Sequence, residues 1–193
     1  MTQTTEKAFE SYVEQILHAQ GWNSGTNAEW DVDRALFPDR ICAFLQDTQP
    51  DLWKDMRDLH AAGLESLLVN GLVKELNLKG TLHILRHGFK FYGKTFRLAY
   101  FKPANGLNDE VLALYAKNLL TITRQVLCHP RKHDTVDMLF AVNGLPVATC
   151  ELKNPGTGQT WRKAVSQYQS DRDPRAPLFG FKTRALVHFA ADP

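Results

Sequence analysis

The chain has 193 residues, of which 44% are hydrophobic and 23% are charged, and its formal net charge is +2. This length suits one domain, or one with a small appendage, whose core needs neither disulfides nor a structural metal. The three widely spaced cysteines show no zinc-ligand spacing, and no apolar run approaches the roughly 20 residues of a membrane span. Polar residues follow Met1 where a signal peptide would have an apolar stretch, so we expect a reduced, cytoplasmic protein with no membrane partner.

The first predicted element is a helix near the amino terminus. Apolar residues recur at helical spacing over residues 9–17, Thr4 or Thr5 can cap the helix, and Gly21 ends it. Glu10 lies on or beside the apolar stripe of this helix.

The next part of the chain predicts further helices after an irregular stretch. Prolines and aspartates interrupt residues 22–50, where we expect loops and a short helix at 40–45. Leucines recur at helical spacing over residues 51–78, which we therefore predict to be helical, and Gly80 ends this part.

The periodicity changes after Gly80. Residues 81–101 are rich in β-forming residues around a turn at 93–94, so they predict a hairpin. A loop follows, and Asn108 or Asp109 can cap a helix that ends near residue 118.

Three strands are predicted next, at residues 120–127, 135–142 and 146–153, with a tight turn at Asn143-Gly144. Residues 154–156 then break the chain, residues 159–172 predict a helix, and residues 185–189 predict a last strand. The sequence has no internal repeat and no low-complexity segment.

Two of these apolar strands carry ionisable residues in their interior. Asp137 lies in the second strand, and Glu151 and Lys153 lie in the third. Burial of an unpaired carboxylate costs several kcal/mol, and two converging carboxylates repel each other unless a cation lies between them. Glu151 and Lys153 share one face, because residues two apart in a strand do.

Whether Asp137 shares that face depends on the turn between the strands. A plain two-residue turn at Asn143-Gly144 would place Asp137 opposite Cys150, on the wrong side of the sheet. A β-bulge, or a three-residue connection, would place Asp137 opposite or diagonal to Glu151. The chemistry therefore predicts one of these two irregular connections.

The residues themselves suggest a metal-dependent reaction. Two carboxylates, from Asp137 and Glu151, and a backbone carbonyl, from Leu152, can hold Mg²⁺ or Mn²⁺. Lys153 would help lower the pKa of the attacking water or stabilise a pentavalent phosphorane. The alternative is a strand-edge aspartate and a surface Glu–Lys pair, but acids inside adjacent apolar strands favour a site.

The charge distribution points to a polyanion, although the nearly neutral total does not. Residues 153–184 carry seven basic residues against two acidic ones, Asp171 and Asp173: Lys153, Arg162, Lys163, Arg172, Arg175, Lys182 and Arg184. We expect Arg162, Lys163 and Arg172 to contact the phosphates of double-stranded DNA. An ordinary solvated surface remains the alternative.

The arrangement Asp137…Glu151-Leu152-Lys153 resembles the PD-(D/E)xK nuclease superfamily. The surrounding segments resemble, more narrowly, the amino-terminal nuclease region of the R (restriction and motor) subunit of type I restriction enzymes. These segments share a position at or beside the predicted strands and helices: residues 115–118 (YAKN), 123–126 (TRQV), 143–146 (NGLP), 151–155 (ELKNP), 167–168 (QY), 171–172 (DR) and 185–189 (ALVHF). The opening residues 5–10 and Gly21-Trp22 also fit.

The resemblance implies an α/β restriction-endonuclease-like core, a mixed central sheet flanked by helices. It implies a single nuclease domain over residues 1–193, in which 30–80 is a helical elaboration and 81–190 the catalytic core. It further implies Mg²⁺-dependent endonucleolytic cleavage of double-stranded DNA, in complex with methylation and specificity subunits.

The same resemblance implies roles for two residues outside the Asp–Glu–Lys set. Glu10 matches the acidic residue that the first helix of the family contributes near the metal, although a solvated glutamate is an equal alternative. Gln167 matches the glutamine of the helix that follows the ExK strand. Related nucleases have a tyrosine four residues later, where this chain has Asp171, and its tyrosine is Tyr168.

Family members continue into an ATP-driven translocase, but this sequence contains no GxxxxGK[ST] loop. The chain ends soon after the last predicted strand, and we interpret it as the front piece of a larger motor subunit, in which ATP would bind elsewhere. Two other interpretations are a stand-alone PD-(D/E)xK repair nuclease and a non-catalytic module that binds DNA or docks on a partner subunit.

Overall fold

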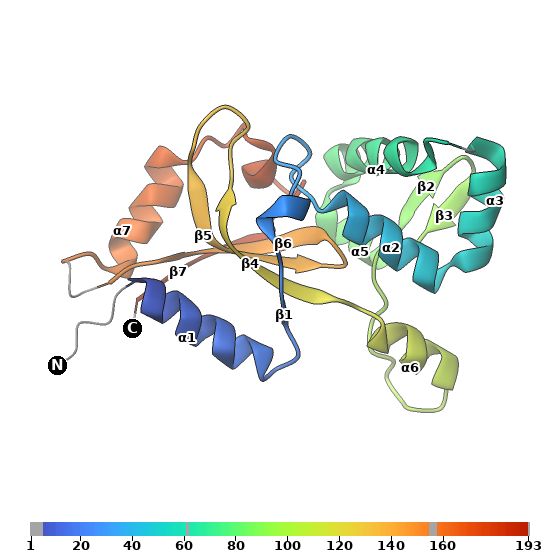
Figure 1. Cartoon of the computed structure of the whole chain (residues 1–193), viewed down its shortest axis with the longest axis horizontal. Helices are drawn as coiled ribbons and strands as arrows, with labels where there is room; N and C mark the ends of the chain where they lie inside the picture. Colours follow the sequence, from blue (N-terminus) through green and yellow to red (C-terminus); the bar gives the residue numbers. More distant parts are fainter. Residues whose placement is uncertain (1–5, 61, 155–157, 193) are drawn as a thin grey trace.

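A mixed five-stranded sheet forms the centre of the computed structural model, which describes residues 6–60, 62–154 and 158–192 (Figure 1). The strand order is β1 (Asn23–Ser24), β4 (Leu120–Leu127), β5 (Thr135–Val142), β6 (Leu145–Leu152) and β7 (Val187–Ala191). The three central strands are antiparallel, whereas the short β1 and the last strand β7 run parallel to their neighbours. The sheet is therefore mixed and flanked by helices, as predicted.

Two helical elements cover the part of the sheet that holds the predicted site residues. Helix α1 (Glu6–His18) packs its apolar stripe on Ile122, Met138 and Leu152. Helix α7 (Trp161–Ser166) contacts β6 and β7, and a π-helical turn, η3 (Gln167–Asp171), continues it. Figure 1 shows both helices at the same end of the molecule as the two chain ends.

A helical region with its own apolar core adjoins the other end of the sheet (Figure 1). It contains α2 (Pro38–Thr48), α3 (Pro50–His60), α4 (Leu64–Lys79), α5 (Thr81–His87) and the hairpin β2 (Phe89–Phe91) and β3 (Lys94–Phe96). Fully buried leucines of α4 and the phenylalanines of the hairpin form its centre, and Leu145 joins it to the sheet.

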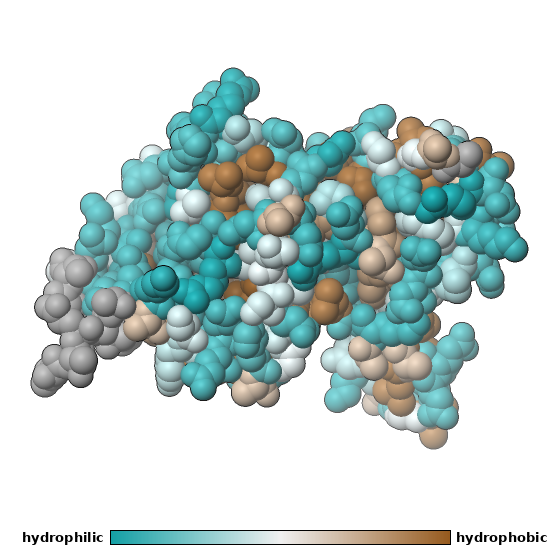
Figure 2. Space-filling view, in the orientation of Figure 1, coloured by the Kyte–Doolittle hydropathy of each residue, from teal (hydrophilic) through white to brown (hydrophobic). Residues whose placement is uncertain are grey.

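Helix α6 (Asp109–Ala116) follows, and Asn108 caps it by accepting a hydrogen bond from Val111 N at 3.0 Å. Apolar residues gather over α6 and beside it in the space-filling view (Figure 2). A cavity of about 370 Å³ lies there, lined by Tyr100, Phe101, Tyr115 and Val142 among others. Val142 is at the opposite end of β5 from Asp137, so this cavity is not part of the predicted site.

Most predicted elements are confirmed, with some corrections. The predicted hairpin over residues 81–101 is wrong in its first part, because 81–87 form helix α5. Thr81, Ile84 and Leu85 are buried at helical spacing, so packing against α4 overrides the β-forming composition. The short helix predicted at 40–45 is longer, and the predicted strand at 185–189 begins two residues later.

The remaining differences concern segment ends. The helix predicted at 159–172 is α-helical only over 161–166, and the π turn follows it. The capping residues predicted for the first helix, Thr4 and Thr5, and residues 155–156 of the predicted chain break lie outside the described residues. Within the residues that the structure describes, no helix is long and apolar enough to cross a membrane.

Candidate active site

The β5–β6 hairpin contains a β-bulge, which lies within the paired strands beyond the turn. Asn143 and Gly144 form a two-residue turn with φ angles of 52° and 87°, and Val142 pairs with Leu145. The register then shifts between Phe140 and Ala141, so that Met138 pairs with Cys150. By continuation of this register, Asp137 is level with Glu151, and the prediction of a bulged connection is confirmed.

Asp137 is tied directly to the strand that carries Glu151. Its Oδ2 accepts a hydrogen bond from the backbone N–H of Leu152 at 2.7 Å, and its Oδ1 accepts one from Gln125 Nε2 at 3.2 Å. Both oxygens of Asp137 therefore have a fixed direction toward β4 and β6.

Glu151 is buried, with 1% of its side chain exposed, and two cations lie against it. Arg172 Nη2 donates to its Oε1, and Lys153 Nζ is 3.9 Å from its Oε2. Burial raises the pKa of Glu151 to about 7, and the charge of Asp137 acts in the same direction, whereas Arg172 opposes both. The carboxylate is therefore held where its charge is costly and only partly compensated.

Lys153 is also withdrawn from solvent, with 10% of its side chain exposed. Its backbone N–H donates to Ala191 O at 2.9 Å, which fixes it against β7, and its Nζ is 3.7 Å from Glu6 of α1. Buried Glu151 and Lys153 do not form the surface ion pair that was the alternative interpretation.

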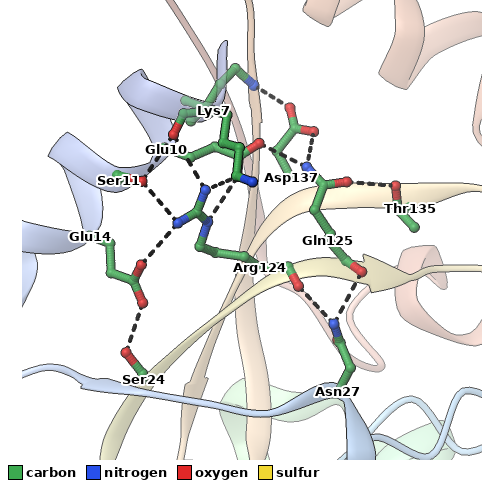
Figure 3. Close-up of polar contacts among 11 residues, drawn as sticks. Lys7, Glu10, Ser11, Glu14, Ser24, Asn27, Arg124, Gln125, Thr135 and Asp137 are labelled. Carbon is green, nitrogen blue, oxygen red and sulfur yellow. Dashed lines mark hydrogen bonds and ion pairs between the residues drawn. The ribbon is translucent and has the colours of Figure 1, made fainter. Parts of the chain in front are cut away.

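Glu10 reaches the site through a polar network that Figure 3 shows. This buried glutamate accepts hydrogen bonds from Arg124 Nε and Nη2 at 2.8 and 2.6 Å on one oxygen. Its other oxygen accepts from Gln125 Nε2 at 2.8 Å, and the same Nε2 donates to Asp137. Glu10 is therefore not a solvated surface residue, and one amide group separates it from Asp137.

The π turn brings Tyr168, rather than Gln167, into hydrogen-bond contact with β6. The Tyr168 hydroxyl and Thr149 Oγ1 are 2.8 Å apart, and Thr149 Oγ1 is 2.7 Å from His188 Nδ1 of β7. Gln167 O accepts the backbone hydrogen bond from Arg172 N at 3.2 Å that closes the turn. The extra residue of a π turn shifts the residues that follow it, so Arg172 reaches Glu151.

Arg172 is not on the predicted phosphate-facing surface. Its side chain is 6% exposed, and it donates to Glu151 and to Thr135 O. Arg162 and Lys163, in contrast, are exposed on α7, and the Arg162 guanidinium lies over the Trp161 ring at 4.7 Å. The DNA-contacting role of Arg162 and Lys163 stays a prediction, whereas the burial of Arg172 against Glu151 argues against that role for Arg172.

A polar groove lies beside Arg172, between the β4–β5 loop and residues 173–177. It encloses about 760 Å³ and is lined by His129, Arg131, Lys132 and Arg175, with Asp33 and Asp173 on its acidic side. The His129 ring is 3.7 Å from Asp173, which also accepts hydrogen bonds from Arg175. Of its four basic side chains, only Arg175 lies in the basic stretch 153–184 that the sequence indicated.

Sequence reasoning missed several residues that the structure places in the site. Gln125 and Arg124 connect α1 to Asp137, and Thr149 and His188 connect β6 and β7 to the π turn. In the sequence, Arg124 and Gln125 stood out only as part of segment 123–126, which resembles the R-subunit family. No chemical role was predicted for either residue. Nothing in the pattern distinguished Thr149 from the apolar residues around it.

The donor set suits a hard cation. Asp137 and Glu151 supply carboxylate oxygens, and the effect of Asp137 on the pKa of Glu151 means that the two charges interact. Mg²⁺ is commonly held by one or two carboxylates with waters and substrate phosphates completing its shell. Among the residues that the structure describes, no three His, Cys, Asp or Glu side chains cluster as a metal site.

This fold and site define a mixed α/β protein whose central sheet carries an Asp–Glu–Lys cluster on two paired strands. Over residues 3–191 the chain matches the family described as Type I restriction enzyme R protein N terminus (HSDR_N), and it belongs to that family. The resemblance to the amino-terminal region of the R subunit of type I restriction enzymes is thereby confirmed. A comparison with curated proteins found no match.

Proposed function

We propose that the chain is the nuclease domain of a type I restriction enzyme R subunit, and that it hydrolyses phosphodiester bonds of double-stranded DNA with Mg²⁺ or Mn²⁺. One observation carries this proposal: the β-bulge puts Asp137 level with Glu151, and Lys153 follows on the same face of β6. In this proposal the arrangement would be a PD-(D/E)xK core, and membership of the R-subunit family supports the proposal.

In this proposal the carboxylates of Asp137 and Glu151 and the carbonyl of Leu152 would hold the cation. The bound ion would lower the pKa of a coordinated water and offset charge on the phosphate. Lys153 would assist deprotonation of the attacking water or stabilise the phosphorane. Arg172 would hold Glu151 in place and offset its charge, and Glu10 would add negative charge beside Asp137. Gln167 remains a candidate for a role in catalysis.

DNA would approach along α7 and along the polar groove that is lined by Arg131, Lys132 and Arg175. Arg162 and Lys163 would contact phosphates on one side, and the groove next to Arg172 offers Arg131, Lys132 and Arg175 on the other. Such contacts to the backbone would hold DNA of any sequence, because base edges are not involved. The recognition sequence would then be read by the specificity subunit.

The rest of the assembly is part of the same proposal. The chain would be the front piece of a motor subunit, which would bind ATP in another part and associate with methylation and specificity subunits in the cytoplasm. We propose one domain over residues 1–193, with 81–190 as the catalytic core. The apolar core of the helical region supports treating that region as an elaboration, but it includes Leu85, Phe89 and Phe96, so the elaboration would extend past residue 80.

The test is cleavage of supercoiled plasmid in Mg²⁺, Mn²⁺ or EDTA by the assembled complex, with Asp137→Ala and Glu151→Ala variants. We expect both variants to lose cleavage and to keep their fold by circular dichroism. Asp58→Ala, a change of an exposed aspartate on α3, is the matched control and should cleave like the wild type. Cleavage by either site variant at the wild-type rate would refute the site, and an inactive wild-type complex would favour a non-catalytic docking module.

A further inference from the structure

Gln125 has an unusual backbone conformation for a residue inside a strand. Its φ is 52°, in the left-handed region that non-glycine residues rarely adopt, yet its neighbours are paired regularly: Arg124 with Met138, and Val126 with Val136. These pairs place Gln125 level with Asp137. Strained residues of this kind persist where the surrounding structure holds them, and they concentrate at functional sites.

At Gln125 and Asp137 the alternation of side chains between the two faces of the sheet is interrupted in both β4 and β5. Ile122 and Val126 are four residues apart and would share a face in a regular strand, but they pack in different apolar clusters. Met138 and Val136 on the partner strand are divided in the same way. As a result, Arg124 and Gln125 both reach Glu10, although consecutive strand residues normally point to opposite faces (Figure 3).

The side chain of Gln125 uses every polar atom it has. Its Nε2 donates to Glu10 Oε1 at 2.8 Å and to Asp137 Oδ1 at 3.2 Å, and its Oε1 accepts a hydrogen bond from the Thr135 hydroxyl at 3.1 Å (Figure 3). The reverse orientation of the amide would point an oxygen at two carboxylates, so the two acids fix the orientation, and the Thr135 hydroxyl then donates to the amide oxygen.

Within the part of the chain that the structure describes, the carboxylate of Asp137 is held by neutral donors. Asp137 receives the Gln125 amide and the Leu152 backbone N–H, whereas the neighbouring Glu151 receives a guanidinium. A neutral donor fixes the direction of the carboxylate without supplying a positive charge that would compete with a metal ion. Each carboxylate oxygen can accept a second interaction, so the hydrogen bonds leave Asp137 able to bind a cation.

We propose that Gln125 is a positioning residue of the candidate active site, whose amide orients the carboxylate of Asp137 for a divalent cation and ties that carboxylate to Glu10 on α1. This inference rests on the proposed function and adds a residue that acts through Asp137. Thr135 supports the same arrangement, because its hydroxyl holds the amide oxygen of Gln125 in place.

The experiment measures Mn²⁺ affinity of the full chain by isothermal titration calorimetry, which needs no turnover. Gln125→Leu keeps the size of the side chain and removes both donors. Loss of a group that orients a metal ligand typically weakens metal binding about 10- to 100-fold, and we expect a loss in that range. Thr135→Val keeps the amide and its two hydrogen bonds to the carboxylates but removes the hydrogen bond to the amide oxygen, so we expect a smaller loss.

Two controls separate positioning from stability. Gln46→Leu makes the same change at an exposed position of α2, in the helical region, and should leave Mn²⁺ affinity unchanged. Thermal denaturation in EDTA gives the stability of each variant without metal. A purely structural role would lower the melting temperature of Gln125→Leu while the folded variant kept wild-type Mn²⁺ affinity, and that result would overturn the inference.

The same titrations distinguish this inference from the proposed function. If the wild type shows no Mn²⁺ binding that Asp137→Ala removes, both the metal site and the role of Gln125 are refuted. If the wild type binds Mn²⁺ through Asp137 and Gln125→Leu binds it equally well, only the role of Gln125 is refuted. A selective loss in Gln125→Leu, with Gln46→Leu unchanged, supports both.

Discussion

The guanidinium of Arg172 donates to the carboxylate of Glu151, and its Nη2 also donates to the carbonyl of Thr135 at 2.6 Å. The pair is buried, with 6% of the arginine and 1% of the glutamate side chain exposed. Arg172 thus joins the end of the π turn to β5 and β6 at the candidate site. Its contribution is to the charge balance of that site and not to a surface that meets DNA.

This pair predicts a large stability effect for Arg172→Gln. Removal of one partner of a buried ion pair leaves the other charge uncompensated, which typically costs about 3–5 kcal/mol. We expect a decrease of that order in the free energy of unfolding, measured by urea denaturation in EDTA at pH 8. The double variant Arg172→Gln/Glu151→Gln should recover much of the loss, because neither member of the pair is then left as an uncompensated buried charge. Equal destabilisation of the single and double variants would contradict the pairing.

The raised pKa of Glu151 predicts how stability depends on pH. Its folded pKa, about 7, lies above its ordinary value of 4.5, so the protonated form is favoured by folding. The corresponding stabilisation is fully present below pH 4.5 and is lost as the pH rises through 7. A shift of this size corresponds to about 3 kcal/mol.

The measurement compares the free energy of unfolding of the wild type and Glu151→Gln in metal-free buffer from pH 4 to 8.5. The wild type should lose stability relative to Glu151→Gln across that interval. Saturating Mg²⁺ should reverse part of the loss, because a cation favours the ionised carboxylate. A difference between the two proteins that is constant with pH would show that Glu151 titrates normally.

Local sequence patterns predicted the part of the site that depends on neighbouring residues in the chain. Glu151 and Lys153 were assigned to one face from strand geometry alone. The β-bulge was predicted because a regular turn would have separated Asp137 from Glu151, and the structure contains it. The expectation that the two carboxylates meet therefore predicted the β5–β6 register correctly. The turn residues Asn143-Gly144 alone would have predicted a regular register without the bulge.

The contacts that the sequence could not predict depend on irregular backbone. Arg172 looked like one more surface cation, because a regular helix gives no reason for it to reach Glu151. Gln125 looked like an ordinary strand residue, because nothing in a glutamine signals a positive φ. Helix α5 was missed for a different reason. The composition of its seven residues favours a strand, but in so short a segment packing against α4 decides the structure.

The exposed cations of α7 predict a sequence-independent contribution to DNA binding. Replacement of Arg162 and Lys163 together by glutamine should weaken binding by a similar factor on any duplex. Each phosphate contact contributes about one to the slope of log affinity against log salt, so the slope should fall by up to about two. Fluorescence anisotropy with two unrelated duplexes over a salt series measures both quantities. An unchanged slope would place the DNA on another surface.

Lys153 separates a catalytic role from simple phosphate binding. Its ammonium is largely buried, 3.9 Å from Glu151 and 3.7 Å from Glu6, so it belongs to the site and not to the exposed basic surface. In the proposed reaction it acts on the attacking water or on the phosphorane, which exist only during turnover. Loss of such a transition-state contact costs on the order of a hundredfold to a thousandfold in rate.

Lys153→Ala should therefore nearly eliminate Mg²⁺-dependent cleavage while it removes at most one cation's contribution to DNA affinity. Binding and cleavage are measured on the same variant in the assembled complex, with Lys163→Ala on α7 as the matched lysine control. The control should lose affinity and keep most of its cleavage rate at saturating DNA. If Lys153→Ala instead loses cleavage only in proportion to binding, the lysine is a phosphate contact and the catalytic role assigned to it is wrong.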